Sequence, residues 1–180
     1  MNDSTERLYE RLLVMRCQTG DEHAFAELVE RYGPRLRYFL RKLLANRDRT
    51  EDLLQEVWIE VFRQVPRLQD AGAFKAWIYR ITRGKAALEL RQSGREPQAI
   101  DCAEQVVSRE DGPRFAAEDA ARVHVALDRL PFPHREVLTL RFLEDMRYEE
   151  IGEIIGCPLG TVRSRIHYAK LALERLLRPD

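Results

Sequence analysis

Two short amphipathic helices separated by a tight turn are predicted near the C-terminal end of the chain. Apolar residues recur four apart on each side of the turn: Ile151 and Ile155 before it, Val162 and Ile166 after it. Gly156 is placed to end the first helix in a left-handed conformation, and Pro158 adds a second break. Gly152 carries no side chain, which lets a second helix cross closely. This pattern predicts a helix-turn-helix.

The second of these helices, expected over residues 159–177, is cationic. The segment from Leu159 to Arg178 holds five Lys or Arg and one Glu. The helical period turns four apolar residues inward: Val162, Ile166, Ala169 and Leu173. It places another set on the outer face or beside it: Gly160, Thr161, Arg163, Ser164, Arg165, His167 and Lys170. Such a helix can enter a major groove and contact bases and phosphates, although a basic face can also be merely solvated.

Helical periodicity covers nearly the whole chain, and no strand alternation or hairpin turn interrupts it, so an all-α fold is predicted. Helices are expected over residues 5–18, 21–44, 48–65, 73–92, 115–130, 133–143, 147–155 and 159–177. The pattern fails after residue 92, where Gly and Pro punctuate an acidic stretch without aromatics. Two small helical domains, 1–92 and 115–180, are therefore expected, joined by a flexible acidic linker over 93–114.

Four residues predict local features of the second and third helices. Asp21 is placed to cap the helix over 21–44, and Pro34 inside that segment predicts a kink or a break. Asp48 with Glu51 resembles a capping box for the helix over 48–65.

Charge and cysteine usage bound the class of protein. The formal net charge is 0, but residues 74–91 hold five bases and one acid, so neutrality does not exclude nucleic acid as a partner. Cys17, Cys102 and Cys157 are scattered, which indicates reduced thiols in the cytoplasm rather than disulfides or a zinc site. No apolar run is long enough for a signal peptide or a membrane span. A soluble, cytoplasmic protein without metal, cofactor or membrane insertion is expected.

The helix predicted over residues 48–65 has an acidic outer face. Its apolar stripe is expected to be buried: Leu54, Val57, Trp58, Val61 and Phe62. The opposite face presents Asp52, Gln55, Glu56 and Ile59. An acidic face with an exposed isoleucine suits a basic partner, and a face that is only solvated is the alternative.

The helix predicted over residues 73–92 interleaves aromatic and cationic residues. Its core positions are expected to be Phe74, Trp77, Ile78, Ile81 and Leu88. Candidate contacts to single-stranded nucleic acid are Tyr79, Arg80, Arg83 and Lys85. The preceding loop, residues 67–73, contains Gly72, which would let the backbone approach an extruded base.

Taken in order, these segments resemble the sigma-70 family of bacterial RNA polymerase initiation factors, in its small two-domain extracytoplasmic-function (ECF) group. The segment Gly20–Tyr32 resembles the start of region 2, and Glu51–Trp58 resembles the segment that grips the clamp helices of the polymerase β′ subunit. The segment Phe74–Ile81 resembles the one that melts and reads the −10 element. Leu130–Leu138 and the helix-turn-helix resemble region 4, which reads the −35 element and binds the β flap.

The resemblance implies a sigma factor that binds core RNA polymerase and directs promoter-specific initiation in response to a stress or envelope signal. It assigns polymerase binding to Asp48, Asp52, Gln55 and Glu56. It assigns −10 promoter DNA to Gln69, Asp70, Gly72, Arg80, Arg83 and Lys85. It assigns −35 DNA to Thr161, Arg163, Ser164, Arg165, His167 and Lys170. It also admits an anti-sigma factor as a partner.

Three positions depart from the family pattern. Gly84 stands where Asn is frequent in the −10-reading helix, which bears on base preference there. Arg147 replaces the usual Ser and removes a hydroxyl cap from the helix over 147–155. Gly152 replaces a common Ala, which destabilises that helix by less than about 1 kcal/mol.

The alternative function is a stand-alone helix-turn-helix regulator that binds operator DNA without polymerase. It accounts for residues 133–177 but leaves the acidic and the aromatic-basic helices without a purpose. An enzyme is not expected, because the chain has no phosphate-binding loop, no His-Glu-x-x-His and no Gly-x-Ser-x-Gly, and its histidines lie far apart.

Overall fold

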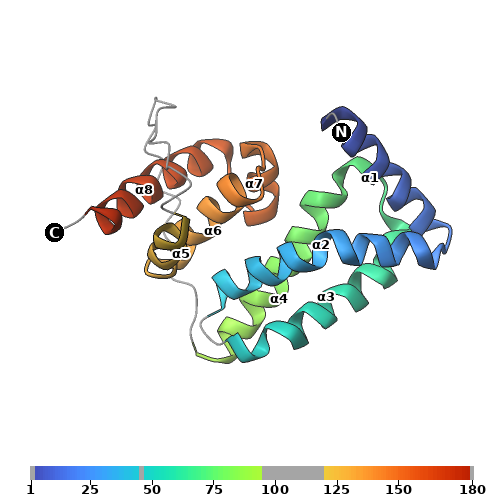
Figure 1. Ribbon diagram of the computed structural model, residues 1–180, viewed down its shortest axis with the longest axis horizontal. Coiled ribbons are helices and arrows are strands. Elements are labelled where there is room, and N and C mark those ends of the chain that lie inside the picture. Colours follow the sequence, from blue (N-terminus) through green and yellow to red (C-terminus); the bar gives the residue numbers. More distant parts are fainter. Residues whose placement is uncertain (1–2, 45–46, 95–119, 179–180) are drawn as a thin grey trace. The chain divides into compact units, whose positions relative to one another are not determined.

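The computed structural model describes residues 3–44, 47–94 and 120–178 (Figure 1). Within these ranges every regular element is helical, which confirms the predicted all-α fold. The chain divides into two compact units, Met1–Gln92 and Ser93–Asp180, called unit 1 and unit 2 below. None of the described helices is both long and apolar enough to cross a membrane.

The predicted linker falls mostly outside the described part of the chain. Of residues 93–114, only the first two are described. The helix expected from residue 115 is described from Ala120 onward. Cys102 also lies in this gap, and neither of the two described cysteines, Cys17 and Cys157, forms a disulfide.

The described residues of unit 1 form four α-helices: α1 (Asp3–Gln18), α2 (Glu22–Leu43), α3 (Thr50–Gln64) and α4 (Phe74–Gln92). Each begins and ends within two residues of its predicted bounds. Short 3₁₀ turns lie between them at Arg47–Arg49, Val65–Arg67 and Ala71–Ala73. Helix α2 packs against α1, α3 and α4, and α3 packs against α4 (Figure 1).

Aromatic side chains from α2 and α4 form the centre of the unit 1 core. Tyr32 and Phe39 of α2, and Phe74 and Tyr79 of α4, are at most 1% exposed. The ring centroids of Phe39 and Tyr79 lie 5.2 Å apart, and those of Tyr32 and Phe74 lie 5.4 Å apart. Each such pair stabilises the fold by about 0.5–1.5 kcal/mol beyond its burial. The hypothesis that Tyr79 contacts nucleic acid is therefore wrong, because its ring is enclosed in the core.

The buried face of α4 differs from the predicted one. It runs through Phe74, Ala76, Ile78, Tyr79, Thr82, Ala86 and Leu90. Leu88, which the spacing predicts in the core, is 49% exposed, and Trp77 and Ile81 are only half-buried. The buried face thus combines large apolar residues with the small residues Ala76, Thr82 and Ala86, which allow neighbouring helices to pack closely.

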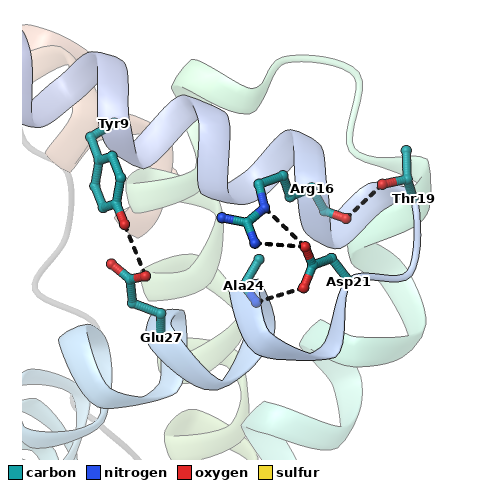
Figure 2. Close-up of polar contacts among 6 residues, drawn as sticks. All are labelled: Tyr9, Arg16, Thr19, Asp21, Ala24 and Glu27. Atoms are coloured by element: carbon teal, nitrogen blue, oxygen red, sulfur yellow. Dashed lines mark hydrogen bonds and ion pairs between the residues drawn. The ribbon is translucent and has the colours of Figure 1, made fainter.

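A cluster of polar contacts fixes α1 on α2 (Figure 2). Asp21 caps α2 as predicted, since its Oδ1 accepts a hydrogen bond from the Ala24 amide at 3.0 Å. Its Oδ2 accepts one from Arg16 Nε at 2.9 Å. The Ala24 amide, and next the Arg16 guanidinium, hold the pKa of Asp21 below its usual value. A second contact between the same two helices joins Tyr9 of α1 to Glu27 of α2: the Tyr9 hydroxyl donates to the Glu27 carboxylate at 3.0 Å.

Two local features of unit 1 differ from the simplest expectation. Pro34 does not break its segment, because α2 continues as one helix through it; packing on three other helices offsets the lost backbone hydrogen bond. Helix α3 begins one residue after Arg49, and the Arg49 side chain does not cap it. The Glu51 carboxylate instead accepts two hydrogen bonds from the Arg37 guanidinium, at 2.6 and 3.0 Å.

The described residues of unit 2 form α5 (Ala120–Asp128), α6 (Phe132–Leu138), α7 (Tyr148–Ile155) and α8 (Leu159–Leu177). The helix predicted over 133–143 is observed as α6 followed by a π-helical turn, Thr139–Leu143. Helix α8 packs against α5, α6 and α7, so three neighbours cover it.

Replacing Gly84 with alanine is expected to stabilise unit 1 by roughly 0.5–1 kcal/mol. Gly84 is exposed in the interior of α4, and a Cβ built there has no neighbour within 4 Å. Alanine therefore loses less backbone entropy than glycine without meeting a clash. Urea unfolding followed by tryptophan fluorescence measures the change, since Trp58 and Trp77 both lie in unit 1. An unchanged or lower unfolding midpoint would contradict this expectation.

Candidate functional site

The turn between α7 and α8 has the geometry that the sequence predicts. Gly156 has φ 69° and ψ 38°, the left-handed conformation that favours glycine. The amides of Gly156 and Cys157 both donate to the Gly152 carbonyl, at 2.9 and 3.1 Å. The helix-turn-helix is thus closed by backbone hydrogen bonds at its turn.

Gly152 is needed because the turn folds back onto it. A Cβ at this position would lie 2.9 Å from the Cys157 carbonyl oxygen and 3.7 Å from Cγ2 of Val162 on α8. The close approach predicted for Gly152 is confirmed, and the nearest atom belongs to the backbone of the turn rather than to the second helix.

The four residues predicted to face inward from α8 are all buried: Val162, Ile166, Ala169 and Leu173. On the outer face, Gly160 and Arg163 are exposed, and Arg165, His167 and Lys170 are partly exposed. The prediction that Ser164 faces outward is wrong, because this side chain is only 7% exposed. Thr161, which was expected beside the outer face, is only 4% exposed. The Ser164 hydroxyl donates to the Thr161 carbonyl at 3.1 Å. Because three helices cover α8, its buried face is wider than one apolar stripe.

A basic pocket of about 350 Å³ opens beside this outer face. Its lining consists of Arg141, Phe142, Arg147, Tyr148, Glu149, Arg163 and Lys170. The Arg141 guanidinium lies 5.3 Å from the centre of the Tyr148 ring, and Lys170 Nζ lies 5.1 Å from the centre of the Phe142 ring. Four cations and one carboxylate therefore line a hollow with aromatic walls, an arrangement suited to a phosphate group.

Arg141 and Arg147 were not found by sequence reasoning as members of this site. Arg141 belongs to the π-helical turn, and Arg147 is the N-cap of α7. An arginine has no acceptor atom, so α7 is capped from the other side: the Glu150 carboxylate accepts from the Arg147 amide at 2.7 Å. With Arg instead of Ser at position 147, the hydrogen bond from the Arg147 amide to Glu150 is kept, and the hydroxyl cap is absent. The arginine also adds a cation to the pocket.

The predicted −10 residues fall into two groups within unit 1. Gln69, Asp70 and Gly72 are exposed in the loop before α4, where the Asp70 carboxylate accepts from the Gly72 amide at 2.8 Å. On α4, Arg80 is exposed, and Arg83 and Lys85 are partly exposed.

The predicted polymerase face of α3 is accessible. Asp48, Asp52 and Gln55 are exposed, Glu56 is partly exposed and Ile59 is 43% exposed, as expected. The prediction that Phe62 is buried is wrong, since this side chain is 60% exposed. Its ring packs edge-on against Phe25, with centroids 5.3 Å apart, and Phe25 packs in the same way against Trp58 at 5.9 Å. The face therefore ends in an accessible aromatic cluster.

Two acidic residues of this face are already engaged in ion pairs. The Asp52 carboxylate lies 2.7 Å from Arg49 Nη1, and the Glu56 carboxylate lies 3.4 Å from Lys85 Nζ. The second pair joins a predicted polymerase residue to a predicted −10 residue, so the two surfaces adjoin. The described residues contain no group of three or more His, Cys, Asp or Glu that could hold a metal ion.

Comparison with known families gives two matches. The family described as Sigma-70 region 2 matches residues 28–96, and the family described as Sigma-70, region 4 matches residues 120–173. The RNA polymerase sigma-H factor of Pseudomonas aeruginosa is 33% identical over 184 residues, which cover 93% of each chain. The ECF RNA polymerase sigma-E factor of Escherichia coli strain K12 is 32% identical over 187 residues, which cover 97% of each chain.

Two solved structures are similar over most of the chain. CnrH in complex with the cytosolic domain of CnrY aligns with a TM-score of 0.69 at 25% identity, covering 93% of this chain and 96% of that chain. The sigma factor RpoE in complex with the anti-sigma factor NepR, from Bartonella quintana, aligns with a TM-score of 0.68 at 28% identity. The second alignment covers 87% of this chain and 98% of that chain.

Proposed function

The chain belongs to the ECF group of the sigma-70 family, and we propose which of its surfaces bind polymerase and which bind promoter DNA. It is a sigma factor, which binds core RNA polymerase and directs transcription from specific promoters. The polymerase catalyses the reaction, and we propose that this chain supplies specificity without catalysis of its own. Its place of action is then the cytoplasm.

The outer face of α3, together with Asp48 in the 3₁₀ turn before it, is the proposed polymerase surface. Asp48, Asp52, Gln55 and Glu56 present acidic and polar groups, and Ile59 adds apolar area at the centre of the same face. A basic partner helix would compete for the carboxylates that Arg49 and Lys85 now hold. Exposed pairs of this kind are worth less than about 1 kcal/mol, so their exchange costs little.

The loop before α4 and the start of α4 form the proposed −10 site. Gly72, Gln69 and Asp70 are exposed in this loop, so an unstacked base could reach them from solvent. Arg80, Arg83 and Lys85 supply cations along α4 for the strand that carries this base. Extruding a base costs a few kcal/mol, which these contacts and the polymerase together would offset.

The proposed −35 surface is carried by α8. Arg163 is the exposed candidate for a base edge, with Arg165, His167 and Lys170 beside it. Thr161 and Ser164 no longer belong to the base-reading set, because their side chains are buried in the free protein. The observation that carries this proposal is the basic pocket, because Arg163 and Lys170 are shared between the outer face of α8 and a cavity that suits a backbone phosphate.

An anti-sigma factor is proposed as a further partner. The relative from Bartonella quintana was solved with one, and its structure aligns with both units of this chain. Such a protein would hold the sigma factor inactive until a signal releases it. Co-purification of this chain with the products of genes adjacent to its own tests the proposal, and recovery of the sigma factor free of any such product contradicts it.

Run-off transcription tests the proposed function. Purified core RNA polymerase is assayed with and without this protein on the promoter region of its own gene. Defined transcripts that need both components support an initiation factor. Failure to bind core polymerase, together with tight binding of the free protein to duplex DNA, would instead support the stand-alone regulator.

Replacing Arg163 with alanine is expected to weaken recognition of the −35 element by about 1–3 kcal/mol, because one base-edge contact is lost. The measurement is the ratio of holoenzyme affinities for the promoter and for the same DNA with a scrambled −35 element. Arg175→Ala is the matched control, since Arg175 is an exposed cation in the last turn of the same helix. A ratio that Arg163→Ala leaves unchanged would remove Arg163 from base reading.

A further inference from the structure

Helix α1 holds the loop that leads into α4. Gln18 Nε2 donates to the Leu68 carbonyl at 2.6 Å and lies 3.4 Å from the Val65 carbonyl. Seven residues earlier on the same helix, Arg11 reaches the other end of the loop at Asp70 and Gly72. Residues seven apart lie on one face of a helix, so one face of α1 contacts the loop at both ends. The match to Sigma-70 region 2 begins at residue 28 and does not include α1.

The Arg11 guanidinium lies directly over the backbone of Gly72. A Cβ built on Gly72 would meet Arg11 Nε and Nη2 at 2.8 Å and Cζ at 3.1 Å. A glycine at position 72 is expected to let the backbone approach an extruded base. In the free protein the space at its α-carbon is occupied by a cation from α1 instead, and no larger residue fits without moving that cation.

The guanidinium is loosely held and open to solvent. Its Nη2 lies 3.7 Å from Asp70 Oδ1, and the two side chains are 57% and 66% exposed. An exposed pair at this separation contributes little stability. The Asp70 carboxylate is anchored independently by the Gly72 amide, at 2.8 Å. Arg11 can therefore turn toward another anion without loss of the loop conformation.

Nucleic acid is the anion that the position favours. The loop carries the Asp70 carboxylate, which would repel the phosphates of a strand bound at Gly72. A guanidinium beside that carboxylate offsets the repulsion and offers a planar pair of donors that matches a phosphate. We propose that Arg11 is part of the melted-strand site and contacts a phosphate of the −10 strand next to Gly72. This inference rests on the proposed role of the loop and α4.

The test measures binding of holoenzyme, assembled from core polymerase and the full-length chain, to a labelled single strand. The probe spans the region just upstream of the start site that run-off transcription maps. Affinity is measured at several salt concentrations for the wild type, Arg11→Ala and Arg11→Lys. Arg7→Ala is the matched control, because it removes the same charge from an exposed position one turn earlier on α1.

Arg11→Ala is expected to weaken binding by roughly 3–10-fold at moderate salt and to reduce the slope of log affinity against log salt by about 0.7, the value for one phosphate contact on a single strand. Arg11→Lys is expected to keep most of the slope, and Arg7→Ala to keep both quantities. A purely structural role for Arg11 would weaken binding without changing the slope. Unchanged affinity, or an unchanged slope, in Arg11→Ala overturns the inference.

Two further variants separate this inference from the function it rests on. Gly72→Ala displaces the guanidinium without removing its charge, and it is expected to lower affinity in the same direction as Arg11→Ala. Arg80→Ala removes a cation of α4 from the proposed −10 site. If Arg80→Ala weakens binding but Arg11→Ala does not, only the inference fails. If wild-type holoenzyme does not bind the probe, the −10 role of the loop fails, and the inference fails with it.

Discussion

Replacing Asp52 with lysine is expected to weaken binding of the protein to core RNA polymerase by about 100-fold, or roughly 3 kcal/mol. Asp52 is an exposed carboxylate in the first turn of α3, on the face proposed to meet a basic partner. A lysine there would place like charges against each other in the complex, and it would also lie beside Arg49, the present partner of Asp52. Titration of labelled protein with core polymerase at fixed salt measures the dissociation constant.

The control for this experiment is Glu30→Lys, the same charge reversal at an exposed position of α2. It is expected to change the dissociation constant by less than about threefold, since a remote exposed charge acts mainly through screened long-range attraction. Circular dichroism shows whether each variant folds. If Asp52→Lys binds as tightly as Glu30→Lys, the docking surface does not include this end of α3.

Replacing Gly152 with valine is expected to destabilise unit 2 by about 2–3 kcal/mol, because the added atoms must displace backbone. The Cβ alone would lie 2.9 Å from the Cys157 carbonyl oxygen, and the turn cannot move without loosening the two hydrogen bonds that Gly152 accepts. Hydrogen exchange of the α7 and α8 amides in the full-length protein measures the local free energy of opening. Recognition of the −35 element should weaken in parallel.

Gly160→Val is the matched control for this substitution, because a Cβ on Gly160 meets nothing within 4 Å. Its effect on exchange from α7 and α8 is expected to stay within about 0.5 kcal/mol, as for ordinary surface substitutions. Both tryptophans lie in unit 1, so an unchanged tryptophan unfolding curve would show that the damage is confined to unit 2. Equal exchange in the two valine variants would mean that the turn accommodates a side chain at position 152.

Features that depend on neighbours in the chain were predicted well. The helices of unit 1 begin and end within two residues of their expected bounds, Asp21 caps α2, and Gly156 is left-handed. Each of these follows from the residue itself and from others a few positions away. The inward residues of α8 were also correct, because the centre of an apolar stripe is a property of the helical period.

Errors arose at the edges of those stripes. Thr161 and Ser164 are polar yet buried, while Phe62 and Leu88 are apolar yet about half exposed or more. A period locates the middle of a helix face, but the width of the buried face depends on how many other helices cover it. Helix α8 has three such neighbours, whereas the end of α3 leaves Phe62 in solvent.

Local spacing and residue type were sufficient to predict the family, the helices and the turn that joins α7 to α8. Which side chains share a site depends instead on how the helices pack. The basic pocket joins Arg141 and Arg147 to Lys170 across about thirty residues, and the loop at Gly72 receives Arg11 from another helix. No periodicity connects such residues. They meet because burial of the apolar faces sets the helix packing, and that packing then determines which exposed side chains become neighbours.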